Sequence, residues 1–387
     1  MGWVAGAAFL VEPGKMRNFV FPMNTETGTI VFSPGAGGVS EYHQLIRVAD
    51  PSLSYARQLE EVLAACTRAS EGRTVHFRRF FLSDGANQAP QLETALAALP
   101  SVPTSIVQQA PLDGTRIALW LYCTSPMDSS CGVPSHNGYS HCWSGSMTWA
   151  GPDSRAQMEG IFEQYGEALL EEGLAMASDT IRTWIFVRDV DTNYGGVVIG
   201  RRHYFDRIGL TPSTHYIAST GIEGRHPDAR YLVEMDAYSV KGLRPGQIRF
   251  LYARDHLSPT YDYGVTFERG AAVTYGDRRH VFISGTASID AAGQVMHVGD
   301  VAAQTGRMLE NISALLTEAG AGLGDLAMGI VYLRDAADYP IVKPIVSDAC
   351  PHLRPLYVLA PVCRPSWLVE MECLAVTGDG DPSFPAF

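Results

Sequence analysis

The stretch "RRHVFISGTASI", residues 278–289, decides how the last third of the chain is interpreted. Its apolar residues indicate a buried strand, and Gly285 supplies a turn. Residues 300–320 carry apolar side chains at helical spacing and end in glycine, which predicts a helix. Residues 328–335 predict a second strand, and residues 354–376 predict one or two more. The predicted order of this unit is therefore β-α-β-(β)β.

The middle third of the chain repeats this order. "CWSGSMTW" (142–149) matches the glycine turn, and "IFEQYGEALLEEGL" (161–174) matches the helix. "TWIFVRD" (183–189) matches the second strand, and "LVEMDAYSV" (232–240) closes the copy. The extra length falls at "TNYGGVVIGRRHYFDRIG" (192–209), where we expect a loop.

A fainter copy opens the chain. "IVFSPGAG" (30–37) resembles the glycine turn, and "RQLEEVLAAC" (57–66) resembles the helix in the character of its residues. "VHFRRFFLSD" (75–84) matches the second strand, whereas the last strand, "RIALWLY" (116–122), has no acid pair. Internal repeats of this kind indicate that one structural unit is used several times.

Three such units, each burying one sheet face, predict an α/β (α+β) protein with a pseudo-threefold arrangement made from one chain. We expect an N-terminal extension over 1–29 and three units over 30–125, 126–245 and 246–387. Because the ring closes within one chain, we expect a monomer.

Composition narrows the function. The chain has 387 residues, 46% of them hydrophobic and 18% charged, which is typical of a globular protein. Its net charge of -12 argues against a nucleic-acid partner. We find neither an apolar run that could span a membrane nor a signal peptide in "MGWVAGAAFLVEPGK", and we expect a cytoplasmic protein.

The seven cysteines are irregularly spaced, which does not indicate a disulfide framework. Cys123, Cys131 and Cys142 lie near His136 and His141 in the sequence, but no CxxC or HxxxH spacing is present. We therefore predict free thiols and no metal site.

Two acid pairs stand in strands that are otherwise apolar. Glu370 and Glu372 are two residues apart in "LVEMECLAV" (368–376), so they point to the same face of a strand. Glu234 and Asp236 repeat the pattern in the middle copy. Such a pair is suited to acid–base chemistry, because burial and a second carboxylate both raise a carboxyl pKa. The alternative is a structural pair that bonds backbone groups or forms a buried salt bridge with Arg364 or Arg334.

Together these motifs resemble the RidA/YjgF superfamily, whose members are small trimers with active sites between subunits. The pattern "FISGTASID … GDVAAQTGRMLENISALL … VYLRD … RP … LVEMECLA" carries the resemblance. Residues 209–290 resemble more specifically the chorismatases, enzymes of secondary metabolism that remove pyruvate from chorismate without a cofactor. The resemblance extends over residues 30–376 and implies tandem RidA/YjgF-like (chorismate-mutase-like) units.

The resemblance also implies roles for particular residues. Glu370 matches the family's general acid, with Glu372 as the partner that keeps it protonated or oriented. Gly276 and Cys363 match the branch of the family that forms 3-hydroxybenzoate, and we expect both beside the substrate ring. Cys363 could also be a buried apolar residue, the commoner fate of a free cysteine. Glu234 and Asp236 are interpreted as structural.

The two substrate carboxylates need cationic partners, and guanidinium groups suit them best. We rank the candidates Arg225, Arg354 and Arg269, of which Arg354 stands near the position of the superfamily's carboxylate-binding arginine. Each could instead be a surface charge. Tyr263 and Tyr275 are candidates for the ring pocket, or they could be packing residues of strands.

Three functions remain open beside the 3-hydroxybenzoate-forming chorismatase. These are a hydrolytic chorismatase that gives a dihydroxycyclohexadienoate, an imine or enamine deaminase like the small RidA proteins, and a binding module without catalysis.

Overall fold

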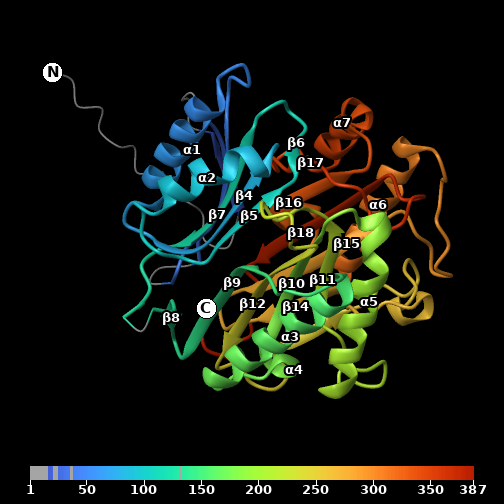
Figure 1. Cartoon of the computed structure of the whole chain (residues 1–387). Helices are drawn as coiled ribbons and strands as arrows, with labels where there is room; N and C mark the ends of the chain where they lie inside the picture. Colours follow the sequence, from blue (N-terminus) through green and yellow to red (C-terminus); the bar gives the residue numbers. More distant parts are fainter. Residues whose placement is uncertain (1–15, 21–24, 35–37, 131) are drawn as a thin grey trace.

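The computed structural model describes residues 16–20, 25–34, 38–130 and 132–387 (Figure 1). The described chain forms three β-sheets with helices packed against them, so the α+β class predicted from the sequence is confirmed. We call the parts of the chain that build these sheets the first, second and third units.

The third unit contains the seven-stranded sheet, in the order β13-β14-β15-β18-β16-β17-β6. Its own strands are β13 (Ile248–Leu251), β14 (Gly270–Thr274), β15 (Arg279–Ala287), β16 (Leu326–Leu333), β17 (Leu356–Leu359) and β18 (Val369–Thr377). Its helices are α6 (Val301–Glu318) and α7 (Tyr339–Ala349), with short 3-10 turns η1 (Thr260–Tyr263), η2 (Leu323–Asp325) and η3 (Ala336–Asp338).

The second unit contains a five-stranded sheet in the order β11-β10-β12-β9-β8. Its strands are β8 (Ser135–His136), β9 (Tyr139–Met147), β10 (Thr180–Val187), β11 (Ala218–Glu223) and β12 (Val233–Lys241). Its helices are α3 (Ser154–Glu171), α4 (Met176–Asp179) and α5 (Val190–Arg207).

The first unit contains a six-stranded sheet in the order β1-β2-β3-β7-β4-β5. Its strands are β1 (Met16–Val20), β2 (Thr25–Phe32), β3 (Glu41–Val48), β4 (Thr74–Leu82), β5 (Thr104–Gln108) and β7 (Ile117–Thr124). Its helices are α1 (Tyr55–Ser70) and α2 (Gly85–Leu96). The short strand β6 (Ala110–Pro111) leaves this unit and pairs with β17 of the third.

The three sheets share one topology. In each, the strand before the first helix pairs with the last strand of the unit, which pairs in turn with the strand after that helix. The series β3-β7-β4-β5, β9-β12-β10-β11 and β15-β18-β16-β17 are therefore equivalent. In each unit a register shift interrupts the pairing at the start of β4, β10 or β16. The internal repeat predicted from the sequence is thus present in all three sheets.

Two details of that prediction were wrong. The strand that leads into α1 is β3, whereas only residues 30–32 of "IVFSPGAG" belong to a strand, β2, and residues 35–37 lie outside the described residues. The expected loop at 192–209 is helix α5, which is equivalent to α7. Gly196 and Gly200 pack closely on α3: a Cβ at Gly200 would stand 2.8 Å from the Arg155 carbonyl oxygen. They serve a helix–helix contact, so they do not indicate a loop.

The N-terminal boundary also differs from the expectation. Strand β1 and most of β2 fall within the expected extension 1–29, yet both belong to the first sheet. Residues 1–15, on which the signal-peptide interpretation depended, lie outside the described residues. In the described part of the chain, no helix has the length and apolar character needed to cross a membrane.

Aromatic side chains from all three units meet in one core. Rings separated by 4.4–6.0 Å link the units in a continuous cluster. Its members are Phe77, Trp120, Trp143, Trp184, Tyr238 and Phe282. Such ring contacts stabilise the junction more than the burial of apolar surface alone would. They also determine which faces of the three sheets pack together.

Candidate active site

Strand β18 carries Glu370 into a small cavity between the second and third units. The cavity has a volume of about 30 Å³, and Tyr194 and Thr220 of the second unit line it together with Tyr263, Arg269 and Glu370 of the third. Glu370 stands opposite Ala287 of β15 and Tyr332 of β16, so both neighbouring strands fix its position. The site is therefore made by two units and belongs to neither alone.

Gly285 makes room for this acid. The residue lies in the register shift of β15, and a Cβ built there would overlap Glu370 Oε1. Any larger residue would have to displace the carboxyl group. The absence of a side chain at Gly285 thus allows the close approach of Glu370.

The surroundings of Glu370 keep it protonated. Burial raises its pKa to about 8, and the neighbouring charge of Glu372 contributes in the same direction. The charges of Arg182 and Arg269 partly oppose this rise. At neutral pH the group can therefore donate a proton, as the sequence predicted for a general acid.

Glu372 is bound by side chains of the second unit. Its Oε2 accepts a hydrogen bond of 2.9 Å from Arg182 Nη2, and its Oε1 accepts one of 3.0 Å from Trp184 Nε1. Arg79 of the first unit lies 3.8 Å away. Its neighbours are therefore not Arg364 or Arg334, which the sequence suggested. The pair consists of one anchored carboxylate and one carboxyl group directed at a cavity.

Arg269 lines this cavity, and Arg201 interacts with Tyr194 of its wall; both arginines are buried. Arg269, one of the three candidates from the sequence, donates to the Ser258 carbonyl oxygen at 2.9 Å and lies over the Tyr263 ring. Arg201 on α5 was missed, because its segment was expected to be a loop. Its Nε donates to Thr266 Oγ1 at 3.0 Å, and its Nη2 has no hydrogen-bond partner among the described residues.

Tyr194 connects Arg201 to the cavity. It is also on α5, its side chain lines the cavity, and it interacts with both Arg201 and Cys363. Burial raises the pKa of the Tyr194 hydroxyl well above its ordinary value, so the group stays a neutral hydrogen-bond donor. Reading α5 as a helix would have placed residues 194 and 201 on one face, since they are seven apart.

Cys363 also lines the cavity, as expected from the sequence. Burial, together with the charge of Glu370, raises the pKa of this thiol to about 12. The thiol is therefore neutral near pH 7. It can donate a weak hydrogen bond but is a poor nucleophile or base.

Gly276 and Tyr275 do not line the cavity of Glu370, and Tyr275 is a packing residue, the alternative that the sequence left open. They form the turn between β14 and β15, whereas Glu370 stands beside the other end of β15, roughly 25 Å away at the usual rise per residue. Gly276 N donates to the Pro385 carbonyl oxygen at 2.7 Å. Tyr275 packs edge-on against Phe387.

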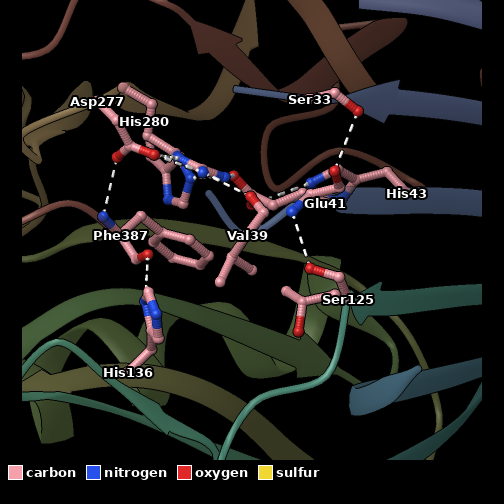
Figure 2. A network of polar contacts seen from close by, with 12 residues as sticks. Ser33, Val39, Glu41, His43, Ser125, His136, Asp277, His280 and Phe387 are labelled. Carbon is pink, nitrogen blue, oxygen red and sulfur yellow. Dashed lines mark hydrogen bonds and ion pairs between the residues drawn. The ribbon is translucent and has the colours of Figure 1, made fainter. Parts of the chain in front are cut away.

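Figure 2 shows the polar network around this turn. Phe387 N donates to Asp277 Oδ1 at 2.9 Å, and the Phe387 carbonyl oxygen lies 2.7 Å from His136 Nδ1. Glu41 lies 2.6 Å from Arg278 Nη1 and 2.8 Å from His280 Nε2. Residues 275–280 thus hold the three units together and have no place in the cavity of Glu370.

Arg225 and Arg354 do not line the cavity either. Arg225 pairs with Asp189 at 2.7 Å and with Glu223 at 3.1 Å near the surface. Arg354 is exposed and packs against Gly28 of β2, in the junction between the third and first units. Both interact with surface or junction residues, which is the alternative that the sequence left open.

The second acid pair occupies the equivalent junction between the first and second units. Asp236 binds Arg79 at 2.7 Å, just as Glu372 binds Arg182. Glu234 Oε1, however, accepts a hydrogen bond of 2.5 Å from Ser146 Oγ. Counting along β9 and β15 from the equivalent pairs with β12 and β18 places Ser146 where Gly285 stands in the third unit. Serine therefore fills the space that glycine leaves open.

A short turn covers the cavity of Glu370. The 3-10 turn η1 ends at Tyr263, whose carbonyl oxygen accepts a hydrogen bond of 3.1 Å from Arg364. Arg202 donates to the Gly264 carbonyl oxygen. Arg269 lines both this cavity and a second one of about 50 Å³ on the other side of the turn.

The described residues contain no group of three or more side chains that could hold a metal ion. Cys142 is half-buried, Cys123 is buried, and His136 and His141 bond to Phe387 and Tyr238. Cys131 lies outside the described residues.

Comparison with known proteins defines first the class of fold. A solved structure described as a chorismatase matches 87% of this chain and 98% of its own, with a TM-score of 0.63 and 18% identity. At this identity the match shows a shared fold. The family model "Endoribonuclease L-PSP" matches residues 270–377.

Sequence relatives then identify the family. The 3-aminoacrylate deaminase RutC of Acinetobacter baylyi is 37% identical over 97 residues, which are 24% of this chain and 77% of the relative. A RutC family protein of Pyrococcus abyssi is 36% identical over 97 residues, or 76% of its length. The chain therefore belongs to the RidA/YjgF family, to which RutC belongs.

Proposed function

We propose that the protein is a chorismatase that converts chorismate to 3-hydroxybenzoate and pyruvate. The observation that carries the proposal is Glu370, a carboxyl group with a pKa raised to about 8 that lines a cavity beside Arg269. The chorismatase-like fold over most of the chain supports it. The proposal requires no cofactor.

The first step uses the proton of Glu370. Chorismate carries an enolpyruvyl ether, and transfer of the proton to its terminal methylene carbon gives an oxocarbenium ion. Carbon is a weak base, so the acid must be protonated at working pH and held in line with the carbon. The raised pKa satisfies the first condition, and the fixed position of Glu370 between β15 and β16 supports the second.

The second step separates the two carbon skeletons. The ring C4 hydroxyl oxygen displaces pyruvate at C3, and the resulting arene-oxide-like species loses its C4 hydroxyl proton and rearranges to 3-hydroxybenzoate. Glu370, now a carboxylate, can accept that proton. The atoms of this step balance without water. Attack by water would instead give the dihydroxycyclohexadienoate.

The substrate carboxylates need positive partners. Arg269 is directed toward the cavity, and Arg201 has an unpartnered Nη2 within the described structure. We assign one substrate carboxylate to each of these arginines, with the Tyr194 hydroxyl as a further donor. Cys363 is assigned to the ring, as a small neutral group that is itself a poor base toward water.

Substrate entry requires the cavity to widen, because sites for small molecules usually have volumes of about 300–1,000 Å³. The turn η1 is the element that would move, since Tyr263 lines this cavity and Thr260 and Tyr261 line the second one. Binding energy from the arginines would then close Tyr263 over the ring and exclude water.

Incubation of the protein with chorismate tests the proposal. We expect pyruvate and 3-hydroxybenzoate in equal amounts, measured by a coupled pyruvate assay and by chromatography. Equal amounts of pyruvate and dihydroxycyclohexadienoate would instead identify a hydrolytic chorismatase. Absence of pyruvate would reject both.

The second candidate is an imine or enamine deaminase, because RutC is described as a 3-aminoacrylate deaminase. One geometric observation disfavours it. Arg354, near the position that the family resemblance assigns to carboxylate binding, lies at the junction with the first unit and not at the cavity of Glu370. Release of ammonia from a short-chain imine, with no turnover of chorismate, would establish this activity instead.

We also propose that the protein acts as a monomer, because one chain supplies three equivalent sheets. Sedimentation at about three times the chain mass of 42.0 kDa would contradict this.

A further inference from the structure

The hydroxyl group of Thr220 bonds to two residues that surround the acid pair. Thr220 is on β11, is buried, and belongs to the wall of the Glu370 cavity. Its Oγ1 accepts a hydrogen bond of 2.9 Å from Gly285 N, across the junction between the second and third units. The same oxygen accepts a hydrogen bond from Arg182 Nη2. One hydroxyl oxygen thus connects the arginine that binds Glu372 with the glycine that faces Glu370.

These bonds engage every hydrogen atom of the two donors. Arg182 Nη2 carries two hydrogen atoms, of which one is donated to Glu372 Oε2 at 2.9 Å and the other to Thr220. Gly285 has a single N–H, and Thr220 accepts it. Neither Arg182 Nη2 nor Gly285 N therefore has a hydrogen atom left to donate to Glu370.

Both donors lie where they could act on Glu370. A Cβ built on Gly285 would overlap Glu370 Oε1 and would stand 3.1 Å from Thr220 Cγ2, so the backbone of Gly285 lies against the acid. The charge of Arg182 already lowers the pKa of Glu370 in part. Without an acceptor at Thr220, two buried N–H groups would lack a partner, and the Glu370 carboxylate is an acceptor beside them. Such bonds favour the ionised form of a carboxyl group.

The position of Thr220 carries a hydroxyl group only at the junctions that contain acid pairs. Thr220 pairs with Trp184 between β11 and β10, and the equivalent residues of the other units are Ser105 and Leu356. Ser105 belongs to the first unit, which supplies the arginine for the acid pair of the second. Leu356 belongs to the third unit, whose strand β16 contacts β2 and β3 of the first, and the last strand of the first unit has no acid pair.

We propose that Thr220 is a positioning residue for the acid, because it occupies two hydrogen-bond donors that would otherwise bind the Glu370 carboxylate. This inference rests on the proposed function, in which Glu370 must carry its proton at working pH. Thr220 acts through Gly285 and Arg182, so it needs no contact with the substrate.

The other charged and titratable groups around Glu370 remain in place when Thr220 is replaced. The charged groups are Glu372 on the same strand, Arg182, Arg269 and Arg364. The remaining groups are Tyr194, Tyr263, Tyr332 and Cys363, and burial raises the pKa of each, so all four are neutral near pH 7. A shift in the titration of Glu370 would therefore report on the two donors that Thr220 accepts.

Thr220→Val tests the role of the hydroxyl, because it removes the acceptor and keeps the shape of the side chain. The pH at which kcat for pyruvate release has fallen by half should move from about 8 to lower pH by about one unit or more. Thr220→Ser keeps the acceptor and should keep the wild-type midpoint. Thr183→Val is the matched control, because Thr183 is buried on the adjacent β10 and its hydroxyl donates to Ser219 of the same sheet at 2.8 Å. It should keep the wild-type midpoint as well.

A second measurement follows Glu370 without chorismate. Protein labelled with ¹³C at the glutamate side-chain carboxyl groups reports the titration by NMR, and Glu370→Gln assigns the signal. We expect the same fall of the midpoint in Thr220→Val. If the wild-type protein released no pyruvate, the proposed function would fail, and this titration would still decide the role of Thr220.

Two results would overturn the inference. One is an unchanged or raised midpoint of the Glu370 signal in Thr220→Val, and the other is an equal fall in Thr183→Val or Thr220→Ser. If Thr220→Val did not fold, Thr220→Cys would replace it, because sulfur is only a weak acceptor. An unchanged midpoint in Thr220→Cys would then overturn the inference in the same way.

Discussion

The junction at Glu370 and the junction at Glu234 have the same construction and different contents. In both, the second acid of the strand binds a buried arginine from the preceding unit, through the pairs Arg182–Glu372 and Arg79–Asp236. In both, the first acid has a pKa raised to about 8, by burial and then by the neighbouring carboxylate. A raised carboxyl pKa therefore does not by itself distinguish a catalytic residue from a structural one.

The difference lies in what faces the first acid. Ser146 donates to Glu234, and its backbone φ of 50° lies in the left-handed region, which is unfavourable for serine. Gly285 offers Glu370 no side chain, and a cavity remains beside the acid. The residue facing the acid thus distinguishes the two junctions. Serine gives Glu234 an internal hydrogen-bond partner, whereas glycine leaves Glu370 free to contact a ligand.

The largest expected effect is on the acid itself. Glu370→Gln should lower the rate of pyruvate release from chorismate by roughly 10²–10⁴-fold, because the proton donor is lost. The matched Glu234→Gln variant should stay within about twofold of the wild type. A coupled pyruvate assay measures both. Similar losses in the two variants would remove the distinction between the junctions.

The next largest effect is expected when the junction at Glu370 is given the serine that the junction at Glu234 contains. Gly285→Ser should displace the Glu370 carboxyl group and lower the rate by about 10²-fold, since an error of about 1 Å in position can cost that much. The reverse change, Ser146→Gly, should leave the rate unchanged. Steady-state kinetics with circular dichroism as a check of folding would show this, and a fully active Gly285→Ser protein would refute the role of the glycine.

A third prediction concerns pH. The reaction needs protonated Glu370, so the rate should fall as pH rises through about 8. Glu372 contributes to the raised pKa, so Glu372→Gln should move this decline to lower pH, at a smaller loss of maximal rate than Glu370→Gln. The pH dependence of kcat reports the shift. If kcat declined at the same pH in Glu372→Gln as in the wild type, the charge of Glu372 would not raise the pKa of Glu370.

The smallest expected effect concerns the pH dependence of thermal stability, and we expect it for the first acid of both junctions. Each first acid has a folded-state pKa of about 8 against an ordinary value of 4.5. Its protonated form therefore stabilises the fold fully below about pH 4.5, and this stabilisation is lost as pH rises through about 8. Glu234→Gln and Glu370→Gln should each flatten the decline of Tm between about pH 5 and 9. Scanning fluorimetry would contradict this if only one variant did so.

Local pattern was sufficient to predict much of the fold. Helix α6 and strand β18 have regular apolar spacing, and burial against one sheet produces that spacing. Helix α5 was missed because Gly195, Gly196 and Gly200 weaken the helical pattern. The last two lie at a close contact with α3, which only the folded chain reveals.

The candidate site was only partly predictable, for a similar reason. Glu370, Cys363, Arg269 and Tyr263 were expected near the substrate, and all four line the cavity. The Arg182–Glu372 bond joins residues 190 positions apart, so no local pattern indicates it. Gly276 was expected beside the ring, whereas Gly285 is the glycine that faces the acid, and only the register of β15 shows this.

The bond between Arg182 and Glu372 has one more consequence. The segment that matches the family model, residues 270–377, contains both carboxylates but neither Arg182 nor Trp184, which bind Glu372. The pKa of Glu370 therefore depends on how the second and third units pack against each other. A change that loosens their contact far from the cavity would alter the acidity of Glu370 without replacing any residue that touches the substrate.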